Sequence, residues 1–134
     1  MSEYETNLKR FWFYLDEIIN RASLKCQLTA DCKPILQEYI DPVVDRSKEE
    51  IAKWNAYTDV EMFAYKVIYN ASFDILSSGK VHVYRGQLDP VGPGQRLLQI
   101  VYDCLDYYQK NGYATKADVE DQIHYLLENI SSVG

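Results

Sequence analysis

Residues 58–79, with the sequence TDVEMFAYKVIYNASFDILSSG, decide the fold. Arranged as a helix, this stretch is apolar on two faces and leaves only a narrow polar strip between them. The first face carries Val60, Phe63, Ala64, Val67, Ala71 and Ile75, and the second carries Met62, Tyr65, Tyr69, Phe73 and Leu76. A helix that is apolar on most sides has to be covered on most sides. We therefore expect residues 58–78 to form the central helix of the protein.

Local signals place the ends of this helix and of the helix at the start of the chain. Thr58 followed by Glu61 has the spacing of a capping box, and Gly79 is well placed to end the helix in a left-handed conformation. Ser2 followed by Glu5 has the same capping spacing. It predicts a first helix that runs to about residue 24 and places Phe13 on its polar side.

The segment 31–57 allows more than one interpretation. Asp31 is a candidate N-cap, and Pro34 would lie in the first helical turn, where its missing N–H costs little. Pro42 either kinks this helix or starts a new one, because the residue before proline resists the helical conformation. Ser47 could begin a further helix. The sequence leaves open whether 31–57 is one kinked helix or two or more.

The last third of the chain predicts two helices joined by a short turn. Residues 80–85 alternate apolar and polar side chains, which we interpret as an extended connector rather than a sheet strand. Helical periodicity follows over 94–111, Gly112 supplies a stop, and Thr115 caps a last helix that ends near Ile130, with residues 131–134 expected to fray. We predict one all-α domain over 1–134: an irregular bundle of five to six helices that ends in an αα-hairpin.

Charge and cysteine content narrow the classes of function. The formal net charge is −6, and from Leu97 onward there are six acidic residues and two lysines. Such a chain does not attract nucleic acid or anionic membranes, whereas a basic protein would be steered to its C-terminal part. Three cysteines without close pairing, and no apolar run long enough for a membrane span, predict reduced thiols and a cytoplasmic location.

The chain has no recognisable catalytic pattern. Cys104 falls on an apolar helical face, and no serine lies in a nucleophile motif. The two histidines, His82 and His124, lie in different elements, and no cysteine has zinc-ligand spacing. We expect no enzymatic activity, no metal and no cofactor.

The first hypothesis for function is a protein-interaction module, meaning an adaptor, an inhibitor or an immunity-type protein. Tyrosine is frequent among the residues that dominate binding energy, and acidic residues steer a basic partner. The sequence holds 12 tyrosines, several of them close to acids in the final hairpin. The predicted contact surface consists of Tyr102, Asp103, Asp106, Tyr107, Tyr113 and Asp118.

The second hypothesis is a sensor of a phosphorylated or other anionic ligand. Gly92, Pro93 and Gly94 precede a predicted helix N-terminus, where unpaired N–H groups attract anions. The ligand would be held by Arg85, Gly92, Gly94 and Arg96. This motif lacks the lysine and hydroxyl residue of a P-loop, and a structural helix entry is the competing interpretation.

The oligomeric state also has two interpretations. The second face of the central helix, with Met62, Tyr65, Tyr69 and Phe73, could be covered by neighbouring helices of the same chain. It could instead pack against a second copy in a homodimer.

Overall fold

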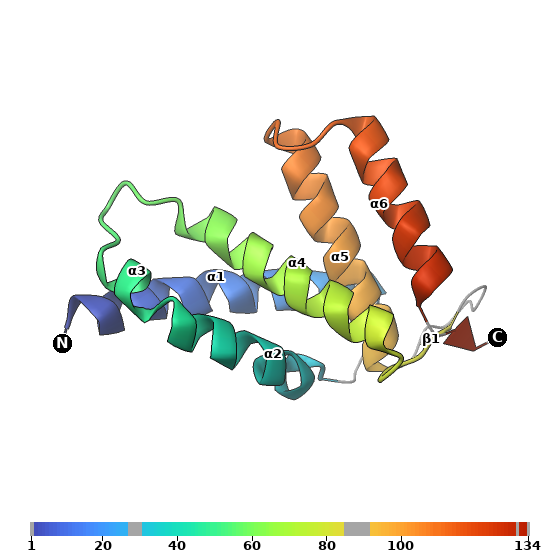
Figure 1. Cartoon of the computed structure of the whole chain (residues 1–134), viewed down its shortest axis with the longest axis horizontal. Coiled ribbons are helices and arrows are strands. Elements are labelled where there is room, and N and C mark those ends of the chain that lie inside the picture. Colours follow the sequence, from blue (N-terminus) through green and yellow to red (C-terminus); the bar gives the residue numbers. More distant parts are fainter. Residues whose placement is uncertain (1, 27–30, 85–91, 131, 134) are drawn as a thin grey trace.

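The computed structural model describes the chain except for residues 1, 27–30, 85–91, 131 and 134, and its helices confirm the expected all-α bundle (Figure 1). In the part that it describes, six helices and two short strands follow one another. They are α1 (Glu3–Cys26), α2 (Lys33–Arg46), α3 (Lys48–Ala52), α4 (Val60–Ser78), β1 (Val83–Tyr84), α5 (Pro93–Lys110), α6 (Lys116–Asn129) and β2 (Ser132–Val133).

Helix α4 occupies the central position that its sequence predicts. It crosses the middle of the molecule and contacts α1, α2, α5 and α6 (Figure 1). Nine of its 19 residues are buried: Val60, Ala64, Tyr65, Val67, Ile68, Ala71, Ser72, Ile75 and Leu76. All of them except the polar Ser72 belong to a hydrophobic core to which all six helices contribute.

The start of α4 differs by one residue from the prediction. The N-cap is Asp59, whose carboxylate accepts a hydrogen bond from the Met62 N–H at 2.9 Å. The Thr58 hydroxyl is used elsewhere, because it accepts from the Asn55 N–H at 3.0 Å and closes the preceding loop. The predicted stop is confirmed, since Gly79 has a φ of 79°.

The open question about residues 31–57 is resolved as two helices. Helix α2 continues through Pro42, and the break comes at Ser47, after which α3 begins. Pro42 lies on the exposed side of α2, as does Glu38 four residues earlier, so water can bond to the carbonyl that loses its helical partner. Asp31 is one residue outside the N-cap, which is Cys32, but its carboxylate accepts from the Lys33 N–H at 2.9 Å.

Residues 80–85 are not simply a connector, and the tail is not wholly frayed. Strand β1 pairs in parallel with β2, so that Val83 lies opposite Ser132 and Tyr84 opposite Val133. Helix α6 returns the chain to β1, which brings together two strands nearly fifty residues apart. The remaining residues of these two predictions, Arg85, Ser131 and Gly134, lie outside the described part of the chain.

The α5–α6 hairpin is confirmed: α5 packs against α1 and α4, and the turn between α5 and α6 projects beyond the other helices (Figure 1). Gly112 ends α5 with a φ of 77°, and Thr115 and Asp118 form a capping box at the start of α6. Five apolar residues recur at helical spacing between Val119 and Ile130, a pattern that predicts one inward face. Leu126 and Ile130 are buried, whereas Val119, Ile123 and Leu127 are half-buried and pack against the edge of the core. Only a narrow strip of α6 is thus buried against the rest of the protein.

A buried amide connects α1 to the end of α3. The Asn7 side chain is 5% exposed and donates hydrogen bonds to the Ile51 carbonyl at 2.8 Å and the Trp54 carbonyl at 3.1 Å. The Ile51 carbonyl, near the end of a helix of five residues, also accepts from the Trp54 N–H at 3.2 Å. Asn7 adds a second donor there and supplies one to the Trp54 carbonyl, which holds the α3–α4 loop against α1.

We therefore predict that Asn7→Ala destabilises the protein by about 2 kcal/mol, because in a buried site the Trp54 carbonyl loses its side-chain donor and the Ile51 carbonyl loses one of its two donors. The free energy of unfolding in urea measures this effect. The matched control is Asn20→Ala on the exposed side of α1, which should change stability by less than about 0.5 kcal/mol. Equal effects of the two substitutions would contradict the role assigned to Asn7.

Candidate functional site

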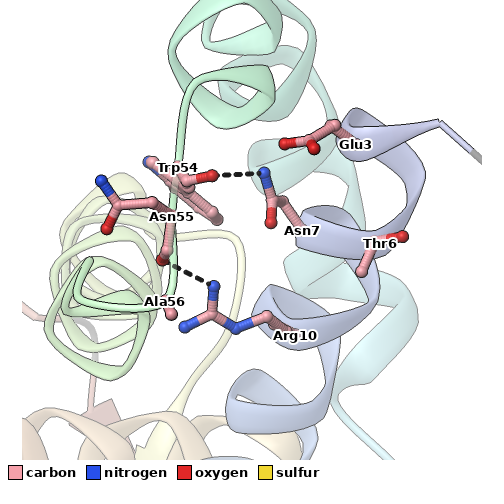
Figure 2. Close-up of a pocket in the computed structure, with 7 residues that line it drawn as sticks. All are labelled: Glu3, Thr6, Asn7, Arg10, Trp54, Asn55 and Ala56. Carbon is pink, nitrogen blue, oxygen red and sulfur yellow. Dashed lines mark hydrogen bonds between the residues drawn. The ribbon is translucent and has the colours of Figure 1, made fainter.

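A cavity of about 670 Å³ lies between the first half of α1 and the loop after α3 (Figure 2). Its lining residues are Glu3, Thr6, Asn7, Arg10, Trp54, Asn55 and Ala56. Two of its polar side chains already serve the fold. Asn7 donates to the Trp54 carbonyl, and Arg10 donates to the Asn55 carbonyl at 3.1 Å. The cavity is therefore a junction between α1 and the loop, with its strongest donors engaged by backbone.

The six residues of the predicted contact surface have different surroundings in the structure. Asp103 is the least accessible of the three acids among them. The Asp103 side chain is 12% exposed. Its Oδ1 atom accepts from Lys25 Nζ at 2.6 Å and from Gln99 Nε2 at 3.0 Å. The partner lysine comes from α1, so Asp103 joins α1 to α5.

Asp106 and Tyr107 border a small cavity of about 140 Å³ between α1 and α5, together with Asp103. Asp106 is exposed and forms an ion pair with Lys110 at 2.8 Å. The Tyr107 ring stacks on Tyr65, with ring centres 3.8 Å apart and planes within 12°. The Tyr65 hydroxyl in turn accepts from Arg21 at 2.8 Å.

The other predicted contact residues have different surroundings. Tyr113 is 58% exposed and lines a separate cavity of about 300 Å³ with Met62, Lys66 and Tyr108. Asp118 is exposed, and its carboxylate accepts from the Thr115 N–H in the capping box. Tyr102 is half-buried and packs against the core.

Two carboxylates outside the predicted contact surface, Asp59 and Glu61, lie at the start of α4 and act on Tyr107 of α5. Burial raises the pKa of the Tyr107 phenol to about 12, and the negative charges of Asp59 and Glu61 add to the shift, followed by that of Tyr113. The start of α4 and the end of α5 therefore meet at one place. We name the group Asp59, Glu61, Met62, Tyr107, Tyr108 and Tyr113 the tyrosine–carboxylate surface.

A row of aromatic rings continues from this surface along α4. Tyr69 contacts Tyr108 with ring centres 5.8 Å apart, and Phe73 stacks on Tyr125 of α6 at 5.9 Å. The Tyr69 hydroxyl also hydrogen-bonds to Gln122 at 3.2 Å. The face of α4 considered for a homodimer is thus covered in large part by α5 and α6 of the same chain.

The residues of the predicted anion site have structural contacts. Arg85 lies outside the described residues. Gly92 has a φ of 89°, and a Cβ at Gly94 would lie 1.8 Å from the His82 carbonyl oxygen. Arg96 is 7% exposed, and its guanidinium donates to the Ile19 carbonyl at 3.3 Å.

Gly94 thus lets α5 approach β1, and Arg96 ties α5 to α1. Since these contacts direct both residues toward the interior, we do not propose an anion site at this loop.

We predict that Gly94→Ala destabilises the protein more than Gly112→Ala. The added methyl at Gly94 would overlap backbone, whereas at Gly112 no atom lies within 4 Å and the cost is the positive φ alone, about 1–2 kcal/mol. Thermal unfolding of both variants measures the difference. A larger loss for Gly112→Ala would contradict the close approach at Gly94.

The three cysteines lie among the described residues, and none of them forms a disulfide. Cys32 and Cys104 are fully buried. Burial raises the pKa of the Cys32 thiol to about 11, against the opposing charge of Arg96, and burial also raises the pKa of Cys104. Cys26 is half-buried, and its thiol donates to the Ala22 carbonyl.

At pH 8 we therefore expect an aromatic disulfide reagent to modify Cys26 in the native protein and to leave Cys32 and Cys104 intact. A thiol reacts as its thiolate, and a raised pKa together with burial suppresses both thiolate and access. Absorbance of the released thiolate should correspond to one thiol in buffer and three in urea. Rapid reaction of more than one thiol in buffer would show that the core opens readily.

Two kinds of feature are absent from the described residues. No cluster of three or more His, Cys, Asp or Glu side chains there has the arrangement of a metal site. None of the helices in that part of the chain combines the length and apolarity needed to cross a membrane.

Comparison with known proteins adds no family to this description. Neither a protein-family model, nor a curated protein, nor a solved structure matches the chain.

Proposed function

We propose that this protein is a non-enzymatic interaction module that binds a basic segment of another protein on the tyrosine–carboxylate surface. One observation carries the proposal: Met62 of α4 lines a cavity with Tyr108 and Tyr113, and the Asp59 carboxylate accepts a hydrogen bond from the Met62 N–H at 2.9 Å, with Glu61 in the same helical turn. Among the described residues neither carboxylate is in an ion pair, and Asp59 keeps its charge while it caps α4.

The chemistry of this surface suits lysine and arginine side chains. A cation gains from a nearby carboxylate and from the face of an aromatic ring, and its aliphatic stem can lie against Met62. The net charge of −6 would raise the rate at which a basic partner arrives, and this effect would decline with salt. Association through the same surface would let the protein act as an adaptor, an inhibitor or an immunity-type protein.

The contact residues differ in part from those suggested by the sequence. Tyr107 and Tyr113 remain in the proposed surface. Asp103 and Asp106 are left out because Lys25 and Lys110 already neutralise them. The proposal keeps the cytoplasm as the location, since cysteines without disulfides are usual in a reducing compartment.

The test is affinity capture from a lysate of the organism that makes the protein, with the whole chain as bait. The bait is used as wild type and as the double variant Asp59→Asn, Glu61→Gln. Asparagine caps a helix as well as aspartate does, so the fold of α4 is retained. We expect a basic protein whose affinity, measured afterwards with purified components, falls about three- to tenfold in the variant and declines with salt.

The matched control is the double variant Asp41→Asn, Asp45→Asn on the exposed side of α2. It removes the same two negative charges from the chain, so any effect of net charge alone is the same in both variants. The captured protein should bind this control as tightly as wild type. Equal losses in the two variants would contradict the proposed location, and a captured partner that is insensitive to both would contradict the role of charge.

A further inference from the structure

The cavity beside the tyrosine–carboxylate surface has a distinct chemical character. Met62, Tyr108 and Tyr113 form most of its wall, and its volume is about 300 Å³. Met62 and Tyr108 are both half-buried, and Tyr108 also packs against the core, so each presents only part of its side chain to the cavity. Such a wall has few groups that could bond to a polar side chain, so it fits an apolar one.

Charges of opposite sign flank this cavity. Asp59 and Glu61 lie beside the lining residue Met62: the Asp59 carboxylate accepts from the Met62 N–H at 2.9 Å, and Glu61 precedes Met62 in the same turn of α4. Lys66 is the remaining lining residue, and in the described part of the chain it forms no ion pair. In a regular helix, five residues separate two side chains by about 140° around the axis and about 7.5 Å along it. Glu61 and Lys66 therefore approach the cavity from different sides.

We infer that the partner segment carries an apolar anchor side chain with a cation on one side of it and a carboxylate on the other. The anchor occupies the cavity of Met62, Tyr108 and Tyr113, the cation lies toward Asp59 and Glu61, and the carboxylate lies toward Lys66. This inference rests on the proposed function and specifies the partner that the same surface selects.

Lys66 makes the surface selective among basic proteins. A segment with cations on both sides of its anchor would bring one of them against Lys66, and like charges at short distance disfavour binding. A segment without an anchor would leave the apolar wall exposed to water. The surface therefore discriminates against merely basic chains, including unstructured basic tails.

Synthetic peptides of equal length, with blocked ends, provide the test. The first kind has two leucines at its centre, two lysines on one side and two glutamates on the other, made in both orders. The second kind has lysines on both sides of the leucines, and the third replaces the leucines of the first by serine. By calorimetry we expect one order of the first peptide to bind about threefold more tightly than the second. We expect the third to bind more weakly still.

The substitution Lys66→Glu should reverse the preference, so that the peptide with lysines on both sides becomes the tighter ligand. Lys66 is exposed, so this change spares the core, and Lys9→Glu on the exposed side of α1 is the control for net charge. Equal binding of the first two peptides, unchanged by Lys66→Glu, would overturn the inference while the proposed function stands. Failure of every peptide to bind wild-type protein would overturn both.

Discussion

The structure depends on the need to cover α4 on two faces. One face is covered by α1 and the segment after α3: Phe63 lies edge-on to Phe11 and to Trp54, with ring centres 5.6 and 5.0 Å away. The other face is covered by α5 and α6, largely through tyrosines. An aliphatic or phenylalanine contact can be sealed completely, whereas a tyrosine needs its hydroxyl to reach water or a partner. The two covers of α4 therefore differ in kind, and the tyrosine side is the one that opens to solvent.

The candidate binding surface lies where that second cover ends. Helix α5 leaves α4 near Tyr108, the turn around Gly112 follows, and α6 starts on the far side of the hairpin (Figure 1). At this place the first turn of α4 keeps its carboxylates and Met62 at the surface. The same geometry that ends the core thus assembles apolar, aromatic and acidic groups from separate helices. No separate element has to be added to the bundle for a binding site to arise.

Features set by neighbours in the sequence could be predicted, and features set by distant contacts could not. The Thr115 cap and the Gly79 stop follow from local hydrogen bonding and backbone conformation, so the residue types at these positions predict them. Thr58 and Asp59 are both good caps, and the choice between them depends on Asn55, which binds the Thr58 hydroxyl. Parallel pairing of two residues with two others leaves almost no local signal, which is why β1 and β2 were missed.

The candidate site shows the same division. An acid at position 103 looks exposed by its charge, but its environment is decided by a lysine of α1 that lies 78 positions earlier in the chain. Glu61 was interpreted through its spacing from Thr58, and nothing near it in the sequence indicates that Tyr107 lies beside it. Tyrosine content and acidity suggested a candidate surface in the final hairpin, whereas the identity of the residues that meet there depends on packing.

The central position of α4 also has a consequence for how the protein is made. The ribosome completes α4 before α5 and α6, and roughly fifty residues separate the end of α4 from the end of α6. At a synthesis rate of ~5–20 residues per second, the tyrosine face of α4 stays uncovered for roughly 3–10 s, until α5 and α6 have been made. For that time Tyr65, Tyr69 and Phe73 form an exposed aromatic surface on the nascent chain, to which other chains can bind. The helix that organises the finished fold is thus, during synthesis, the segment most in need of a chaperone.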